Sequence, residues 1–128
     1  MMMIPVTRDR NNESPVVLLE AADILYIESA NGALVFHTLT DTFYPLAPSL
    51  TTYVKHLQSY GFHKLDRINL VNKHHIARYD HEQGKVFFQS PGGSLGKSTT
   101  VAYIRRGRLR HEIERWIERN THGMDGPY

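Results

Sequence analysis

The dipeptide Asn31-Gly32 constrains the fold of this chain more than any other feature of its sequence. It stands between two apolar runs, Ile24–Ser29 and Leu34–Thr38. A type I′ hairpin turn needs positive φ angles at both of its central residues, and Asn-Gly is a pair that adopts them readily. The apolar pattern resumes at Phe43-Tyr44. The sequence therefore predicts a three-stranded antiparallel β-meander in this region.

Two helices are expected outside the meander. The first has apolar residues at helical spacing, begins after Ser49, whose hydroxyl can cap the first turn, and ends at Gly61. The second closes the chain with a one-sided apolar stripe made of Leu109, Ile113, Trp116 and Ile117. Further short strands are expected over residues 16–19, 62–65, 76–79, 85–90 and 99–104. This order predicts a mostly-β domain of short antiparallel sheets, with one helix after the meander and a C-terminal helix.

The length of the chain, 128 residues, suits a single domain with its own core. Residues 1–14 are polar after the opening methionines, so we expect a loose leader there. The domain is expected over residues 15–120, and residues 121–128, which lack any pattern, are expected to be frayed. A leader this short leaves no room for a receiver domain, so we expect a stand-alone domain.

The sequence argues against disulfide-linked, membrane and metal-binding classes. It contains no cysteine and no apolar run of membrane-spanning length, and its methionine-rich start is too short for a secretory signal. We therefore expect a cytoplasmic protein without membrane contact. His74, His75 and His81 are close in sequence, but neighbours on a strand point to opposite faces and no carboxylate pair completes a ligand set. No metal or other cofactor is expected.

The glycine-rich segment 92–98 satisfies two enzyme motifs only in part. A phosphate-binding P-loop has four residues between its first glycine and the Gly-Lys pair, whereas Gly92 and Gly96 enclose three. The segment also contains G-x-S-x-G around Ser94, but a hydrolase elbow must lead into a helix, and the next residues favour a strand. No catalytic residue is therefore expected; a hydrolase that uses Ser94 is a third alternative for function.

Cationic residues gather in two parts of the chain. The segment Lys97–Arg110 holds five basic residues and no acidic one, although the formal net charge of the whole chain is only +2. Arg67 lies in a polar loop with apolar residues on both sides. A cation on such a loop is suited to contact an anion, and a local basic surface is suited to bind a polyanion. The alternatives are a solvated charged face before the last helix and, for Arg67, a salt bridge to Asp66.

Two stretches, Asp23–Ser29 and Phe62–Ile76, resemble sequence motifs of the LytTR DNA-binding domain family. The family pattern runs Phe, x, Arg, x, His, Arg or Asn, Ser, aromatic, apolar, Val, Asn, with Ile four residues on, and is similar to Phe62–Ile76. The family strand D-I-x-Y-I-E-S is similar to Asp23–Ser29, and the resemblance covers about residues 15–118. This chain departs from the pattern at Asp66, Ile68 and Asn69, where the family has His, Ser and an aromatic residue.

The resemblance implies a transcriptional regulator that binds double-stranded DNA sequence-specifically through three loops. By position these loops hold Asn31, Arg67, and Tyr103 or Arg105. Arg67 suits guanine O6 and N7 in the major groove, or a phosphate, whereas the other cations suit phosphates, which set register without reading sequence. The expected DNA contacts are Asn31, Lys64, Arg67, Asn69, Lys97, Tyr103, Arg105 and Arg106.

The expected partners are paired sites on duplex DNA, together with a regulatory protein or a second copy of the chain. The alternative is a protein-interaction module on the same fold that has lost DNA binding, because an acidic Asp66 facing the phosphates would repel them. The DNA hypothesis requires that the three loops lie on one side of the molecule, with their cations free of neighbouring carboxylates.

Overall fold

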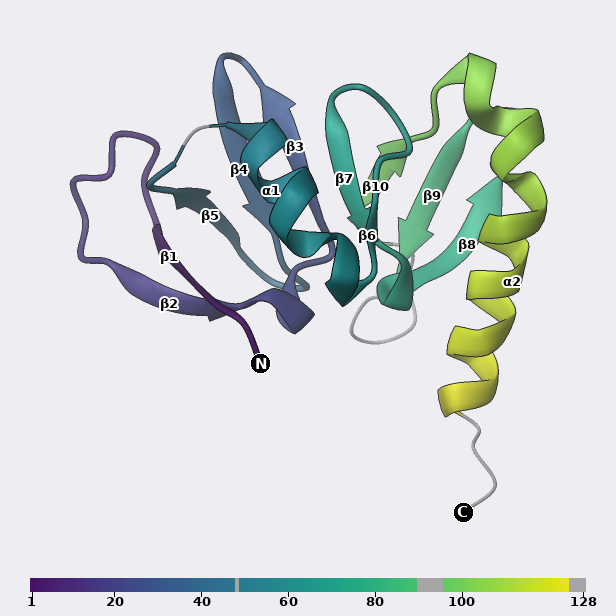
Figure 1. Ribbon diagram of the computed structural model, residues 1–128, viewed down its shortest axis with the longest axis horizontal. Coiled ribbons are helices and arrows are strands. Elements are labelled where there is room, and N and C mark those ends of the chain that lie inside the picture. Colours follow the sequence, from purple (N-terminus) through teal and green to yellow (C-terminus); the bar gives the residue numbers. More distant parts are fainter. Residues whose placement is uncertain (48, 90–95, 125–128) are drawn as a thin grey trace.

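In the part of the chain that the structure describes, two antiparallel sheets and two α-helices make up the fold. The computed structural model describes residues 1–47, 49–89 and 96–124 (Figure 1). The first sheet has the strand order β2-β1-β5-β4-β3-β7-β6, and the second has the order β10-β9-β8. Helix α1 (Leu50–Leu57) lies across the first sheet, and helix α2 (Arg106–Met124) runs along the second (Figure 1). The expected fold class, mostly β with two helices, is confirmed.

The strands are short. In the first sheet they are β1 (Met3–Thr7), β2 (Val17–Glu20), β3 (Tyr26–Ala30), β4 (Ala33–His37), β5 (Thr42–Pro45), β6 (Phe62–His63) and β7 (Asn69–Asn72). In the second they are β8 (Ile76–Asp80), β9 (Lys85–Phe88) and β10 (Ser98–Thr100).

The predicted meander is confirmed as β3-β4-β5. The β3–β4 hairpin pairs Tyr26 with His37 at one end and Ala30 with Ala33 at the other. Its turn residues Asn31 and Gly32 have φ angles of 51° and 79°, as a type I′ turn requires.

Residues 1–14 do not form a loose leader, and this expectation was wrong. Strand β1 pairs with both β2 and β5, and the side chains of Ile4 and Val6 are buried in the core. The following loop is closed by the Asp9 carboxylate. A side-chain hydrogen bond from Ser14 and backbone hydrogen bonds from Glu13 and Ser14 lower the pKa of Asp9 to about 2.

Strand β7 and the first two residues of β3 are buried on both faces of the sheet, and this fixes the position of both strands. On one face, Ile27 and Leu70 join the core that α1 covers. On the other, Tyr26 and Val71 join a second core with the three-stranded sheet and α2. Successive side chains of a strand point to opposite faces, and each buried large apolar side chain contributes about 1.5–3 kcal/mol. The two cores therefore meet on the strands that carry the central loops.

Three details at the ends of helices and strands differ from expectation. Gly61 ends the first helical segment with a φ of 93°, as predicted, but Ser49 makes no side-chain capping bond. The strand expected over residues 99–104 stops at Thr100 and gives way to a 3-10 helix, Tyr103–Arg105. Helix α2 continues through Met124 into the segment that we expected to be frayed. Residues 125–128 and Ser94 lie outside the described part of the chain.

Neither helix of the described residues is long and apolar enough to span a membrane. In the same part of the chain, no three His, Asp or Glu side chains come together in a way that would hold a metal ion.

Candidate nucleic-acid interface

Three loops from separate parts of the sequence lie along one edge of the molecule, the upper edge in Figure 1. They are the β3–β4 turn, the β6–β7 connection and the segment that joins β10 to α2. Asn31, Arg67 and Tyr103 each lie on one of these loops. We call this region the loop edge, defined by residues 31–32, 64–68 and 101–108 together with Arg10, whose guanidinium donates to the Asn31 carbonyl.

The β6–β7 loop is held by the Asn69 side-chain amide. Its Oδ1 accepts hydrogen bonds from the backbone N–H groups of Leu65 (3.3 Å) and Asp66 (2.9 Å). Its Nδ2 donates to the Thr100 carbonyl (2.7 Å) and to the Thr99 hydroxyl (3.0 Å). Asn69 is fully buried, so its amide ties the loop to β10 instead of reaching DNA. We therefore correct the expected role of Asn69 from a DNA contact to a support.

Asp66 also faces the protein. One carboxylate oxygen accepts a hydrogen bond from the Thr100 hydroxyl (2.7 Å), and the other accepts one from the Arg67 backbone N–H (2.6 Å). The charge that was expected to repel phosphates is therefore engaged in closing the loop onto β10.

Arg67 is left at the tip of this loop with an exposed side chain. No ion pair involves its guanidinium among the described residues, so the alternative of a salt bridge to Asp66 is not realised there. The next residue, Ile68, accepts a backbone hydrogen bond from Ser29 at the end of β3 (2.8 Å). The loop that carries Arg67 is thus fixed to the strand that leads into the Asn31 turn.

The third loop is fastened to the second. The Ala102 N–H donates to the Leu65 carbonyl (2.9 Å), and Arg105 Nη1 donates to the Lys64 carbonyl (3.0 Å). Between these two bonds, Tyr103 and Ile104 are 84% and 88% exposed. The side chains of Lys64 and Arg105 are half-buried.

Arg106 folds back onto the protein. Its guanidinium donates to the carbonyl oxygens of Glu82 (3.1 Å) and Gln83 (3.3 Å) in the β8–β9 turn, and lies 5.1 Å from the ring centroid of Tyr103. Gly84 makes room for it, since a Cβ there would lie 2.2 Å from Arg106 Nε. These contacts change our expectation for Arg106 from a phosphate contact to a residue that positions the loop.

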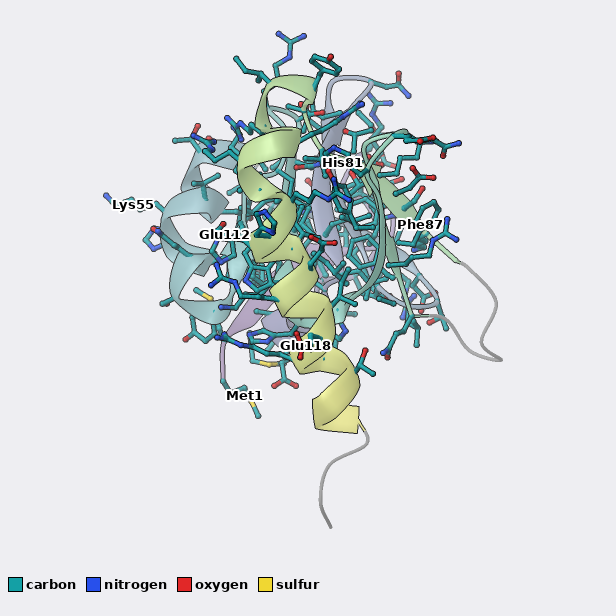
Figure 2. All side chains as sticks on the ribbon, turned by 90° about the vertical axis from the view of Figure 1, so that its right-hand side faces the viewer. Met1, Lys55, His81, Phe87, Glu112 and Glu118 are labelled. Atoms are coloured by element: carbon teal, nitrogen blue, oxygen red, sulfur yellow. The ribbon has the colours of Figure 1, made fainter. Side chains whose placement is uncertain are left out.

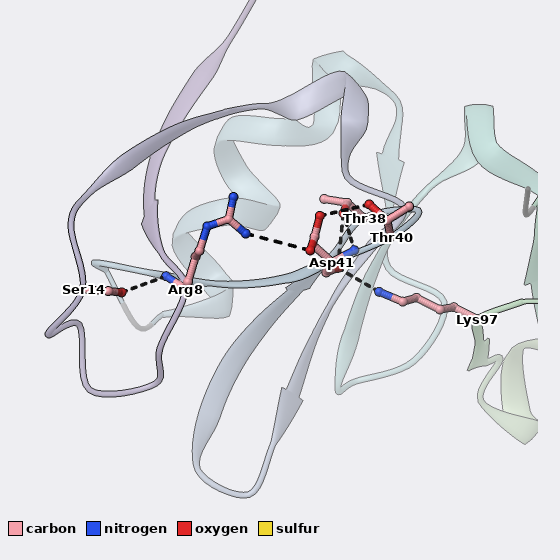
Figure 3. A network of polar contacts seen from close by, with 6 residues as sticks. All are labelled: Arg8, Ser14, Thr38, Thr40, Asp41 and Lys97. Atoms are coloured by element: carbon pink, nitrogen blue, oxygen red, sulfur yellow. Dashed lines mark hydrogen bonds and ion pairs between the residues drawn. The ribbon is translucent and has the colours of Figure 1, made fainter.

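Lys97 lies at the end of the sheets opposite to the loop edge. The structure therefore corrects the expectation that Lys97 contacts DNA together with the three loops. Lys97 precedes β10, whereas Tyr103 follows it. Its Nζ donates to the Asp41 carbonyl (2.8 Å) in the β4–β5 turn, at the end of β4 away from Asn31 (Figure 3). Burial lowers the pKa of the Lys97 ammonium, against the opposing influence of the Asp41 and Glu28 carboxylates.

The loop edge includes a cation that the sequence did not reveal. Arg10, in the β1–β2 loop, is exposed and donates a hydrogen bond to the Asn31 carbonyl. Nothing in the sequence around Arg10 indicates this, because the contact joins residues 21 positions apart.

The start of α2 adds positive charge to the loop edge. Its first turn holds no acidic residue and carries the exposed Arg108; Arg110 follows that turn and lies 3.7 Å from the Glu114 carboxylate. A cation in the first turn of a helix opposes the helix dipole, at a cost of about 0.3–1 kcal/mol. Farther along α2 lie Glu112 and Glu118 (Figure 2), and the sequence of this part of the helix contains both acidic and basic residues. The unfavourable cluster of charge is therefore confined to the end of the helix where an anion would be stabilised.

The sequence and the fold match known proteins. The model of the LytTr DNA-binding domain family matches residues 14–105. The fold is similar to the LytTr DNA-binding domain of a Bacillus cereus protein described as a methyl-accepting/DNA response regulator. The TM-score is 0.65, the identity is 14%, and the match covers 85% of this chain and 94% of that one. A search of curated proteins found no match. The segment matched by the family model contains Asn31, Arg67 and Tyr103.

Proposed function

The chain belongs to the LytTR DNA-binding domain family, and from this premise we propose that it binds double-stranded DNA sequence-specifically through the loop edge and thereby regulates transcription. The observation that carries the proposal is the joining of the three loops by hydrogen bonds along one edge. A surface that is rigid before binding loses little conformational entropy when DNA binds.

Within the loop edge we propose two kinds of contact. Arg67 is exposed and has a planar guanidinium that can donate two hydrogen bonds to guanine O6 and N7, so we assign it to base recognition. Lys64, Arg105 and Arg108 are assigned to phosphates, which fix the register of the protein on the duplex. Asn31 and Arg10, at the far end of the edge, are assigned to the backbone of the same duplex.

The arrangement of Asp66 weakens the main argument for the alternative function. A protein-interaction module without DNA binding was suggested by an acidic residue facing the phosphates. The Asp66 carboxylate instead accepts hydrogen bonds from Thr100 and from the Arg67 backbone, which favours a loop that can approach a polyanion.

The proposal is tested by selecting duplexes from a random pool and measuring their affinity over a series of salt concentrations. Each phosphate contact that is lost reduces the slope of log K against log salt by about 0.9. We expect Lys64→Ala to weaken binding to all sequences alike and to reduce the slope by about one. The 128-residue chain is used, with fluorescence anisotropy of a labelled duplex as the readout.

Lys55→Ala is the matched control, because Lys55 is exposed on α1 and points away from the body of the molecule in Figure 2. We expect this variant to bind as the wild type does. Affinity that is independent of salt would contradict the proposal, as would an equal loss in the two variants.

A further inference from the structure

Two adjacent apolar side chains project from the loop edge without packing against the core. Ile104 is 88% exposed and Tyr103 is 84% exposed, more than any other large apolar side chain of the described residues except Met1. The remaining exposed ones range from 38% to 64%. Neither side chain belongs to either of the two cores, so their apolar character has no role in the fold that the structure describes.

The backbone beneath these side chains is fixed. Ala102 N–H donates to the Leu65 carbonyl (2.9 Å), and Arg105 N–H donates to the Ala102 carbonyl (2.8 Å), closing the 3-10 turn. The Arg106 guanidinium lies 5.1 Å from the centroid of the Tyr103 ring, a cation–π contact that orients the ring. Apolar groups on a rigid turn are suited to a specific contact because little freedom is lost on binding.

The charges around the turn indicate what it contacts. Arg67, Arg105 and Arg108 lie on the same edge, and the turn leads directly into the N-terminus of α2. A partner for this surface must therefore be anionic and also offer an apolar group between its charges. Duplex DNA has such a group in its major groove, the C5-methyl of thymine, and apolar side chains are the usual contacts of that methyl.

We propose that Ile104, with Tyr103 beside it, packs on a thymine methyl group in the major groove and makes this turn a determinant of sequence specificity. This inference rests on the proposed function, since it names the part of the base pair that the third loop reads. The expected effect is modest, because removal of one methyl group from an apolar contact lowers affinity about fourfold.

The experiment replaces each thymine of the highest-affinity selected duplex, one at a time, by deoxyuridine, which lacks only the methyl group. For the wild type we expect about a fourfold loss of affinity at one or two positions and no change at the others. The critical duplex is the one in which deoxyuridine lowers the affinity of the wild type. Ile104→Ala should bind the unmodified duplex about as weakly as the wild type binds this critical duplex. The affinity of Ile104→Ala should be the same for the two duplexes. Because Ile104 is exposed, its thermal unfolding midpoint should be unchanged.

A control separates this contact from a general effect. Leu18→Ala removes an apolar side chain that is 64% exposed on β2, at the outer strand of the large sheet. This variant should keep the wild-type affinity and the wild-type response to deoxyuridine.

The results distinguish failure of the inference from failure of the proposed function. If the wild type binds DNA in a salt-dependent manner but responds to no deoxyuridine, the inference is overturned and the proposed function stands. A response that persists in Ile104→Ala overturns the inference too, since another residue then contacts the methyl. Unchanged DNA affinity of Ile104→Ala likewise overturns the inference, since the side chain then makes no contact that contributes to DNA binding. Absence of DNA binding by the wild type overturns both.

Discussion

Replacement of Arg67 by alanine is expected to lower affinity for the selected duplex about 10- to 100-fold, which corresponds to the loss of one bidentate contact to guanine. The effect is large because Arg67 is exposed at the loop tip and, within the described residues, no carboxylate neutralises its guanidinium. Stability should not change, since the loop is closed by Asn69 and Asp66 and not by the arginine side chain. Anisotropy titrations with specific and scrambled duplexes measure the effect.

Two variants separate base recognition from charge. Arg67→Lys keeps the charge but not the planar fork, so it should bind the scrambled duplex as the wild type does while losing most of its preference for the selected one. Arg119→Ala removes the same charge from an exposed position 13 residues along α2 from Arg106, and should leave both affinities unchanged. An Arg67→Ala protein that keeps full preference for the selected duplex would show that Arg67 does not read the base.

Asn69→Ala is expected to lower the free energy of unfolding by about 3 kcal/mol. The substitution leaves two backbone N–H groups and one carbonyl near the Asn69 site without their partner, and an unsatisfied buried group costs about 1–3 kcal/mol. The residue bridges two of the three loops, so DNA affinity should fall as well, even at temperatures where the variant remains folded. Urea unfolding followed by tryptophan fluorescence measures the stability.

Amide hydrogen exchange shows whether the loss is local. In the folded Asn69→Ala protein, the amides of Leu65 and Asp66 should exchange faster, whereas that of Ile27 in the central strand should remain protected. Asn11→Ala, which removes an exposed amide in the β1–β2 loop, should change stability by less than about 0.5 kcal/mol. If Asn69→Ala is as stable as Asn11→Ala, the buried amide does not hold the loops together.

The parts of the fold that the sequence predicts are those governed by local chemistry. Asn31-Gly32 predicts its hairpin because positive φ angles are a property of the two residues themselves. Gly61 predicts a helix end for the same reason. Strand β1 was missed because its burial pattern depends on pairing with β2 and β5, and only Ile4 and Val6 show alternation among the first residues.

The candidate site was only partly predictable, because the direction of a side chain depends on distant residues. Asn69 turns inward to meet Thr99 and Thr100, 30 and 31 positions away, and no local pattern distinguishes this from an outward amide. Lys97 is different. A strand was expected between Lys97 and Arg105, and the two ends of a strand lie at opposite ends of a sheet. The sequence alone could therefore have separated Lys97 from the other basic residues of the segment Lys97–Arg110.

The central claim is that one edge, made of three joined loops, meets the DNA. Backbone amide NMR spectra recorded while the selected duplex is added to the uniformly ¹⁵N-labelled protein test it most directly. We predict the largest chemical-shift changes at Gly32, Arg67 and Tyr103, and none at Lys97 or Asp41, which lie at the other end of the sheets. Changes centred on Lys97 and Asp41, with the three loops unaffected, would contradict the account.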